Sequence, residues 1–354
     1  MKKRMIDFLL ANADPSIRLR IKEEILHDIT DEERRKFQEQ ILLEPKIPPI
    51  KNAQKENGWI GNGFHGGNKI GGPYDNQEVG TKYLGEKGLK GTDVLDRAMD
   101  AYETTELTDP CYGTKGKYYS EFEIAAFGWN MVRCACIARA HYDDVIDITP
   151  QIEVALESFK RVTEVDSIFD VSRPVKGGRL FNDNEKWPCR YHLEILAFTD
   201  SWKSNENVAM LTDSFNRLMR KDRTEYIDIE INCWVGHKVG PLWRLTEGYS
   251  LMTGPYNHKQ ISDGIRRVNI EKIEWMVRCG LYKNVPELKE EVDRISNSIN
   301  TGGICEVEIY ENEFKEWGPY GGLQLETDWR SKIRKACDIT FRALLVLHYS
   351  DLQD

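Results

Sequence analysis

The sequence predicts an all-α fold in which helical hairpins close into a double ring. Segments that are apolar almost all round alternate with amphipathic segments that carry one charged face. The alternation repeats at roughly 50 to 65 residues, which is longer than a small solenoid repeat but suits helical hairpins. Alternating strand patterns are almost absent. These observations together favour an inner and an outer layer of helices.

The N-terminal residues 1–44 are expected to form two or three amphipathic helices, as an extension of a ring domain over residues 45–354. Asp14 followed by Pro15 is a helix-start signal, because proline is tolerated where the helix needs no N–H donor. Thr30 begins the next helix in the pattern of a capping box.

A break follows this extension. Residues 54–80 are rich in glycine and predict either a mobile surface loop or a lid over a pocket, with His65 and Tyr74 as candidate contacts. A phosphate-binding loop is not supported, since no GK[ST] follows and no strand precedes. The third helix is expected to end, and an extended linker to begin, at the prolines Pro45, Pro48 and Pro49.

The remaining helices are expected in two kinds. The amphipathic segments cover residues 92–104, 149–163 and 207–221. The apolar segments cover residues 119–142, 187–202, 234–252 and 329–349, and a further pair covers 269–282 and 286–299. Half-exposed helices belong outside and apolar ones inside. If one outer helix separates successive inner helices, the inner helices run parallel and their N-terminal ends meet on one rim.

Composition and charge bound the possible partners. The 354 residues carry a net charge of -9, which argues against nucleic acid and anionic membrane surfaces as partners. No apolar run approaches the roughly 20 residues that cross a bilayer. A small molecule is the expected partner, and the oligomeric state is left open.

The expected location is the cytoplasm. The start MKKRMIDFLLANA imitates a signal peptide, but its apolar part is short and Asp7 interrupts it. The eight cysteines are scattered, only Cys134 and Cys136 lie close together, and no CxxC pair occurs. That pattern predicts reduced thiols.

The segment 187–202 organises the expected site. Its interior is apolar, whereas its first two turns carry aromatic and titratable residues. A buried helix that begins in this way is expected to have its N-terminal end in a cavity. The residues concerned are Trp187, Cys189, Arg190, Tyr191, His192 and Glu194.

Four segments resemble a known family: ADPSIRLRIKEEIL, QKENGW from Gln54 to Trp59, WPCRYHLEILAF and ITFRALLVLHY. They look like the prenyltransferase/squalene oxidase repeat proteins, and more widely like terpenoid cyclases and protein prenyltransferases with their α/α toroid. The resemblance implies an α/α toroid and a terpene-cyclase or prenyl-transfer reaction. The substrate would be a mostly apolar small molecule in a central, aromatic-lined pocket.

The chain departs from the family in its catalytic motifs. The DxDD motif of squalene-type cyclases is missing from the sequence. Asp109-Pro110-Cys111 has the spacing of the prenyltransferase zinc ligands, with His141 or His192 downstream, but lacks the glycine-flanked context, so zinc is not expected. No metal ligand is assigned from the sequence and the cofactor stays open, with magnesium the candidate if the substrate is a diphosphate.

Asp143, Asp144 and Asp147 match DDxxD, the magnesium-diphosphate motif of class I isoprenoid enzymes. This copy follows the C-terminal end of a helix, where the dipole disfavours anions, and precedes a helix start at Thr149-Pro150. A solvated turn is the preferred interpretation.

Within the 187–202 segment, Cys189 and His192 share a helix face. They suit a thiolate nucleophile, half of a metal site, or simple pocket lining. Arg190 and Glu194 form an intrahelical pair, or Glu194 acts as an acid with a raised pKa. The candidate proton-transfer residues are Glu194, His192 and Glu121.

Aromatic and titratable residues recur where the apolar segments begin. These residues either pack where the ring of helices narrows or line a cavity with π-faces that stabilise cations. The loop Trp317-Gly318-Pro319-Tyr320-Gly321-Gly322 is expected to cap the same rim. The candidate substrate-binding residues are Tyr119, Trp129, Trp187, Cys189, Arg190, Trp234, His237, Trp243, Trp329 and His65.

Two other classes of function stay open. A non-catalytic toroid that binds a small molecule or a partner helix fits the lack of a complete catalytic motif. A carbohydrate-active α/α barrel would place two carboxylates opposite each other on the inner rim.

Overall fold

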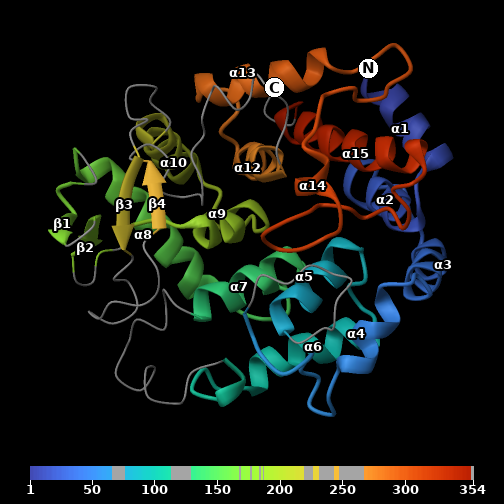
Figure 1. Cartoon of the computed structure of the whole chain (residues 1–354), viewed down its shortest axis with the longest axis horizontal. Coiled ribbons are helices and arrows are strands. Elements are labelled where there is room, and N and C mark those ends of the chain that lie inside the picture. The colour runs from blue at the N-terminus through green and yellow to red at the C-terminus, as the bar shows by residue number, and fades with distance from the viewer. Residues whose placement is uncertain are drawn as a thin grey trace.

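The computed structural model describes residues 1–65, 76–112, 129–166, 169–175, 178–182, 185, 187–218, 226–230, 243–246 and 267–351. Within these ranges the chain is mostly helical, with one small sheet (Figure 1). The expected helical fold class is confirmed at this level. No helix among the described residues is long and apolar enough to span a membrane.

The N-terminal helices are α1 (Lys2–Asn12), α2 (Pro15–Arg20) and α3 (Asp31–Leu42), and α2 continues into a π-helical turn, Ile21–Ile25. The capping box at Thr30 is confirmed: Thr30 Oγ1 accepts from the Glu33 N–H at 3.2 Å, and Glu33 accepts from the Thr30 N–H. The α1 helix packs against α15, and Lys2 pairs with Asp351 at 2.5 Å.

The expected linker after Pro45 is wrong, because helix α4 (Ile47–Ala53) occupies it. Pro48 and Pro49 lie in its first turn, where the backbone N–H groups have no partner within the helix, so proline does no harm there.

Helix α5 (Gln77–Glu86) begins inside the segment expected to be a glycine-rich loop. Asn76 caps it, since its Oδ1 accepts from the Val79 N–H at 2.8 Å. Nearly all of α5 is buried, including Glu78 and Lys82, so its polar residues do not mark an exposed face and the amphipathic pattern does not predict the helix. Helix α6 (Asp93–Thr104) follows as expected.

Six of the later helices lie where apolar or amphipathic segments are expected. They are α7 (Trp129–Arg139), α8 (Thr149–Glu164), α9 (Arg190–Ala197), α10 (Asn205–Leu218), α12 (Arg267–Arg278) and α13 (Pro286–Asn297). A short helix α14 (Glu311–Phe314) precedes α15 (Lys332–Asp351), and a 3-10 turn covers Pro110–Tyr112. Helix α9 is shorter than the segment 187–202, because Pro188 and the N-cap Cys189 precede it.

The sheet has the order β1-β2-β3-β4 and comprises β1 (Ser172–Val175), β2 (Gly178–Phe181), β3 (Tyr226–Glu230) and β4 (Trp243–Thr246). The β2–β3 pair is parallel and the other two pairs are antiparallel. The expected helix over 234–252 is therefore wrong at 243–246. Gly240 and Pro241 disfavour a helix there, and Trp243 and Thr246 suit a strand.

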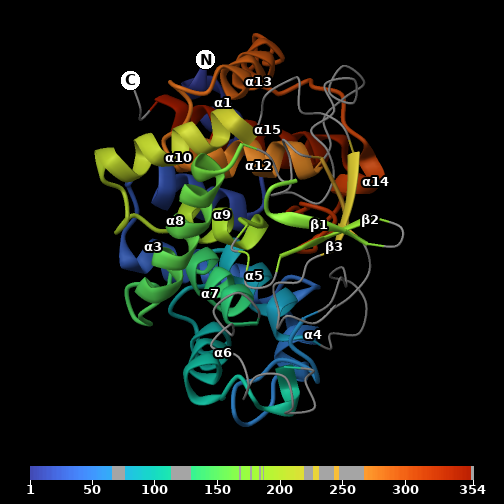
Figure 2. The ribbon, with the colours of Figure 1, turned by 90° about the vertical axis from the view of Figure 1, so that its left-hand side faces the viewer.

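The apolar helices pack side by side. Helix α7 contacts α5 and α9, α9 contacts α12, and α12 contacts α15 (Figure 1). Helices α8 and α10 lie outside α9, as Figure 2 shows.

Neighbouring helices in this row run in the same direction. At its first residue α9 pairs Arg190 with Glu271 in the first turns of α12, and Phe198 just after α9 lies under Arg278, the last residue of α12. Similarly, the last residue of α7, Arg139, pairs with Glu86 at the end of α5. The first residue of α7, Trp129, lies beside His65, which contacts Glu78 in the first turn of α5.

Candidate functional site

Helix α5 carries a stripe of buried charges. Glu78, Lys82 and Glu86 are spaced four residues apart and so lie on one face of the helix. Their exposed fractions are 0%, 0% and 5%. Buried charges at this level require partners, which neighbouring helices supply.

Arg139 of α7 joins three helices at one point. Its guanidinium donates to Glu194 of α9 at 2.9 Å and to Glu271 of α12 at 3.1 Å, and it lies 3.3 Å from Glu86. Lys82 donates to the other oxygen of Glu194 at 2.8 Å.

Glu86 extends these contacts to α15. Arg342 donates to Glu86 at 2.7 Å, and the Trp317 indole N–H donates to its other oxygen. Burial raises the pKa of Glu86, but Arg342, Arg139 and Arg20 outweigh it and hold that pKa well below its usual range.

A second branch lies beyond Arg342. Glu274 of α12 pairs with Arg278 at 2.9 Å, and Arg278 pairs in turn with Glu24 in the π-helical turn. Glu24 also accepts from Arg20 and from the Tyr349 hydroxyl.

We call these twelve side chains the central charge network. Its six carboxylates are Glu24, Glu78, Glu86, Glu194, Glu271 and Glu274, and its six cations are Arg20, Lys82, Arg139, Arg190, Arg278 and Arg342. The two sets balance. Such a network favours a unique arrangement of helices, and removing one member leaves an unpaired buried charge.

At one edge of the network, His65 lies against Glu78. The Nδ1 atom of His65 is 2.8 Å from Glu78 Oε2, and its side chain is 34% exposed while Glu78 is fully buried. Burial raises the pKa of Glu78, but Lys82 and hydrogen bonds from His65 and Tyr320 lower it to about 2. Because Glu78 is a carboxylate, Nδ1 must carry the proton, which leaves Nε2 of a neutral His65 as the acceptor.

Two tyrosines complete this edge. Tyr320 donates its hydroxyl proton to Glu78 Oε1 at 2.6 Å, and the Tyr320 hydroxyl oxygen lies 3.2 Å from His65 Nδ1. The Tyr191 hydroxyl contacts that of Tyr320. Burial raises the pKa of both phenols well above the usual range, so they stay neutral donors.

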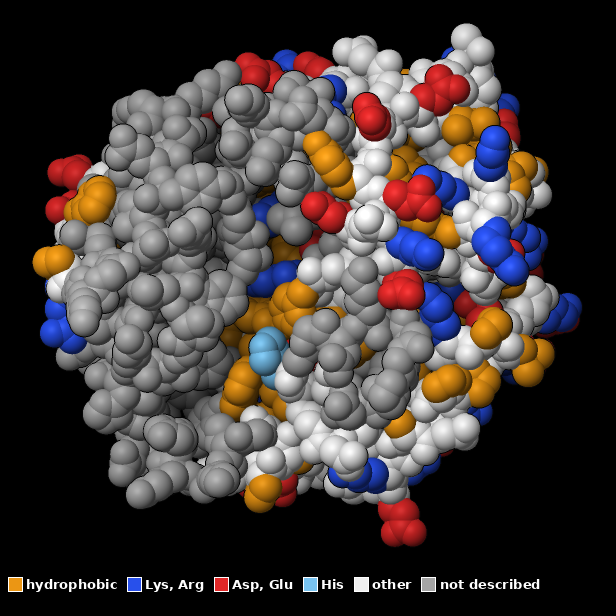
Figure 3. Space-filling view, viewed as in Figure 1, with side chains coloured by type: hydrophobic (Ala, Val, Ile, Leu, Met, Phe, Trp, Pro, Cys, Tyr) orange, Lys and Arg blue, Asp and Glu red, His pale blue; other side chains and the backbone are white. Residues whose placement is uncertain are grey.

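Trp129 provides an aromatic surface beside His65. The ring centroids of Trp129 and His65 are 4.9 Å apart, and the ring centroids of Tyr320 and His65 are 5.5 Å apart. Trp129 and Tyr191 are half-buried. We call His65, Glu78, Trp129, Tyr191 and Tyr320 the mouth. Figure 3 shows a hollow near the middle of one face, where a histidine lies among hydrophobic side chains close to Lys or Arg.

The structure brings the predicted residues His65, Trp129 and Arg190 close to one another. Arg190 stacks on Tyr320 at 4.9 Å and donates to the Pro319 carbonyl at 3.0 Å, so the Trp317–Gly322 loop lies at this edge.

Two predicted proton-transfer residues have structural partners instead. Glu194 is fully buried between Lys82 and Arg139. His192 Nδ1 accepts from the Cys189 N–H at 2.8 Å, and burial lowers the pKa of His192 to about 3. His192 therefore caps α9 in its neutral form, and its ring does not activate the Cys189 thiol, whose pKa burial raises.

Trp329 lies in a different cluster, away from the mouth. Its indole N–H donates to Asp338 at 2.6 Å. Nearby, Arg334 pairs with Asp14 at 2.6 Å and Glu326 at 3.1 Å. We call Asp14, Glu326, Asp338 and Arg334 the acidic cluster.

Other predicted residues bear on the site less directly. Trp187 is half-buried just before α9, and Trp243 lies in β4. Tyr74, Tyr119, Glu121, Trp234 and His237 lie outside the described residues.

The predicted metal motifs have local roles. Asp147 Oδ1 accepts from the Thr149 N–H at 2.9 Å, and Asp144 pairs with Lys90 on the surface. Asp109 accepts from the Cys111 N–H, and burial raises the pKa of Cys111 to about 12. Among the described residues, no group of three or more His, Cys, Asp or Glu side chains is placed to hold a metal.

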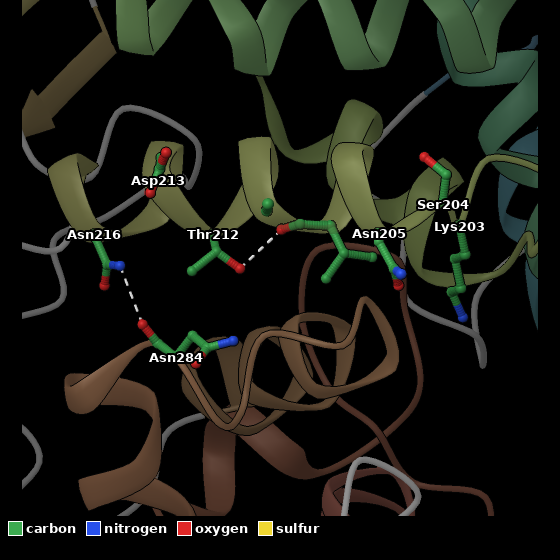
Figure 4. Close-up of a pocket in the computed structure, with 9 residues that line it drawn as sticks. Lys203, Ser204, Asn205, Thr212, Asp213, Asn216 and Asn284 are labelled. Carbon is green, nitrogen blue, oxygen red and sulfur yellow. Dashed lines mark hydrogen bonds between the residues drawn. The ribbon is translucent and has the colours of Figure 1, made fainter.

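A separate groove of about 510 Å³ lies between α10 and the turn after α12 (Figure 4). Asn216 donates to the Asn284 carbonyl at 3.0 Å across it, and Thr212 bonds back to Val208. Amides and hydroxyls dominate its lining, and its titratable members are Lys203 and Asp213. Those groups do not form an acid–base pair, so the mouth is the better candidate.

Glu78, Lys82 and Arg139 carry no catalytic motif that marks them in the sequence. For Glu78 and Lys82 the signal is their spacing of four with Glu86, which predicts that the three residues lie on one helix face. Comparison of the chain with profiles of known protein families, with curated proteins and with solved structures finds no match.

Proposed function

We propose that the chain is an enzyme with the double ring of an α/α toroid, and that its reaction takes place at the mouth. A closed series of contacts supports the ring. Helix α5 contacts α7, α7 contacts α9, α9 contacts α12, and α12 contacts α15, which returns to α5 through the pair Arg342–Glu86. The common direction of neighbouring inner helices also supports it, since one outer helix between them would impose that direction.

The proposed chemistry is acid–base catalysis by His65. The observation that carries it is the half-exposed imidazole whose Nδ1 is held by the fully buried Glu78 carboxylate. A carboxylate that fixes one ring nitrogen orients the other as a base and stabilises the imidazolium that forms. His65 Nε2 therefore takes a proton from the substrate or returns one to it.

The proposed substrate is an uncharged, mostly apolar small molecule. The aromatic rings of Trp129 and Tyr320 both lie next to the His65 ring, which suits apolar groups and developing positive charge. The cations of the described part that lie nearest, Lys82 and Arg190, already pair with Glu78, Glu194 and Glu271. A diphosphate would need cations released from those pairs. A cyclase-type proton transfer fits this mouth better than prenyl transfer.

The test is a substrate panel with matched histidine variants. Purified protein is incubated with geraniol and squalene, and separately with geranyl diphosphate and Mg²⁺, and products are identified by gas chromatography–mass spectrometry. We expect conversion of an uncharged compound. His65→Asn should lower the rate at least about 100-fold, because the amide still donates to Glu78 but cannot act as a base.

His27→Asn is the control. His27 is exposed and has a left-handed backbone (φ 49°), which asparagine tolerates. The reaction rate of His27→Asn should therefore equal that of the wild type. Turnover that survives in His65→Asn, or turnover of the diphosphate alone, would overturn the proposal.

A second candidate is a toroid that binds a small molecule without reaction. The observation that favours it is the central charge network, which joins α5, α7, α9, α12 and α15 by paired charges. A panel compound that raises the melting temperature yet yields no product would support this candidate.

A further inference from the structure

Tyr320 contacts the His65–Glu78 pair from a loop 242 residues further along the chain than Glu78. Its one hydroxyl proton goes to Glu78 Oε1 at 2.6 Å, because a carboxylate is the strongest acceptor within reach. The Tyr320 oxygen then has lone pairs for the Tyr191 hydroxyl and for His65 Nδ1–H at 3.2 Å.

The loop that carries Tyr320 is held by buried contacts on both sides. Arg190 donates to the Pro319 carbonyl at 3.0 Å, Arg342 donates to the Leu323 carbonyl at 3.0 Å, and the Trp317 N–H donates to Glu86. All three partners belong to the central charge network. The position of the Tyr320 hydroxyl is therefore set before any ligand binds.

We propose that Tyr320 is a positioning residue for His65, an inference that rests on the proposed function. Tyr320 holds the Glu78 carboxylate so that Oε2 faces the imidazole, and it offers a second acceptor to Nδ1–H. Both contacts favour the tautomer with the proton on Nδ1. Tyr320 thus keeps Nε2 unprotonated and open toward the substrate, without itself taking a proton from the substrate.

The proposal is tested on ¹⁵N-labelled protein at pH 8, where the ring-nitrogen shifts of His65 report its tautomer. In the wild type we expect the Nδ1–H form. Tyr320→Phe should raise the ratio of the Nε2–H to the Nδ1–H form about fivefold, the change that corresponds to one lost hydrogen bond. Where an uncharged substrate is turned over, kcat should fall in proportion to the loss of the Nδ1–H form and KM should change little.

Tyr349→Phe is the matched control. Tyr349 donates to buried Glu24 at 2.7 Å, as Tyr320 does to Glu78, but at the far branch of the network. The Tyr349→Phe variant should lower the melting temperature about as much as Tyr320→Phe and leave the tautomer of His65 unchanged.

The outcomes separate the two proposals. An unchanged His65 tautomer in folded Tyr320→Phe, or an equal change in Tyr349→Phe, would overturn the role of Tyr320. Should Tyr320→Phe fail to fold, Tyr191→Phe, which removes the hydroxyl that donates to Tyr320, must shift the tautomer in the same direction or the role fails. A tautomer shift in a protein that converts no panel compound would leave Tyr320 as a positioning residue and remove only the proposed activity.

Discussion

The central charge network and the mouth share Glu78 and helices α5, α7 and α9, yet they differ in what their charges can do. In the network six carboxylates meet six cations, and Arg139, 2% exposed, bonds three glutamates. At the mouth, Glu78 carries the same kind of buried charge, but one of its partners is the titratable and half-exposed His65. Burial of charge alone therefore does not single out the proposed reaction site. The half-exposed histidine that contacts Glu78 does.

The largest effect is expected at the centre of the network. Arg139→Met should destabilise the protein by about 3–5 kcal/mol, because it leaves Glu86, Glu194 and Glu271 without their shared cation. Denaturant unfolding measures this. Arg97→Met, at a residue that bonds carbonyls on the surface, is the control and should cost less than about 1 kcal/mol. Equal losses would mean that the network is not the centre of stability.

The acidic cluster offers a contrast to the balanced network. Asp14 and Glu326 pair with Arg334, whereas Asp338 accepts from the Trp329 indole and lies near Arg342. Burial, together with the charges of Asp338 and Asp14, raises the pKa of Glu326 from its ordinary 4.5 to about 9. The folded protein keeps a proton there that the unfolded chain loses above about pH 4.5. The stability that Glu326 contributes is therefore fully present below that pH and is lost as the pH rises toward 9.

Glu326→Gln removes this loss, because its amide donates to Asp14 as the protonated acid does. The gain of the variant over the wild type should grow between pH 5 and pH 9 to a few kcal/mol. Thermal unfolding across that range measures it, with Glu311→Gln, at an exposed surface pair, as the control. A gain that does not depend on pH would contradict a proton held at Glu326.

A smaller effect is expected in the loop that carries Tyr320. Gly322 has φ 88°, and a Cβ atom there would lie 1.7 Å from the Glu316 carbonyl oxygen. Gly322→Ala should cost about 2 kcal/mol in strain and displace Tyr320 from His65. Gly91→Ala is the control, since Gly91 also has a positive φ (79°) but has open space around it. If both variants lose equal stability, only the backbone conformation matters.

The smallest effect is expected at the DDxxD segment. Asp144→Asn removes a surface pair with Lys90, whose side chain is 41% exposed, and should change stability by less than about 0.5 kcal/mol. Added Mg²⁺ should raise the melting temperature of neither the wild type nor the variant. A magnesium-dependent rise that Asp144→Asn abolishes would restore the metal motif.

The fold could be predicted from the sequence wherever one helix face is polar. Helices α6, α8 and α13 begin within about two residues of their expected positions, because their charged faces produce the helical period. Helix α5 was not predicted, because the buried charges of Glu78 and Lys82 make a buried helix look like a polar segment. Strand β4 was not predicted, because Trp243 and Leu245 lie in a short apolar run whose period does not distinguish a strand from a buried helix.

The candidate site could be predicted only in part. His65 and Trp129 stand out by residue type and by their place near glycine-rich and apolar segments. Their partners Glu78 and Tyr320 come from positions 13 and 255 residues away from His65, a pairing that depends on tertiary packing. His192 looked reactive beside Cys189, but its ring nitrogen serves as a helix cap.

The central claim is that His65 presents an unprotonated Nε2 because Glu78 holds the proton on Nδ1. The ¹⁵N shifts of the His65 ring in the wild-type protein at pH 8, assigned by their disappearance in His65→Asn, test it most directly. We expect a protonated Nδ1 and a bare Nε2. A ring that carries its proton on Nε2 would contradict it.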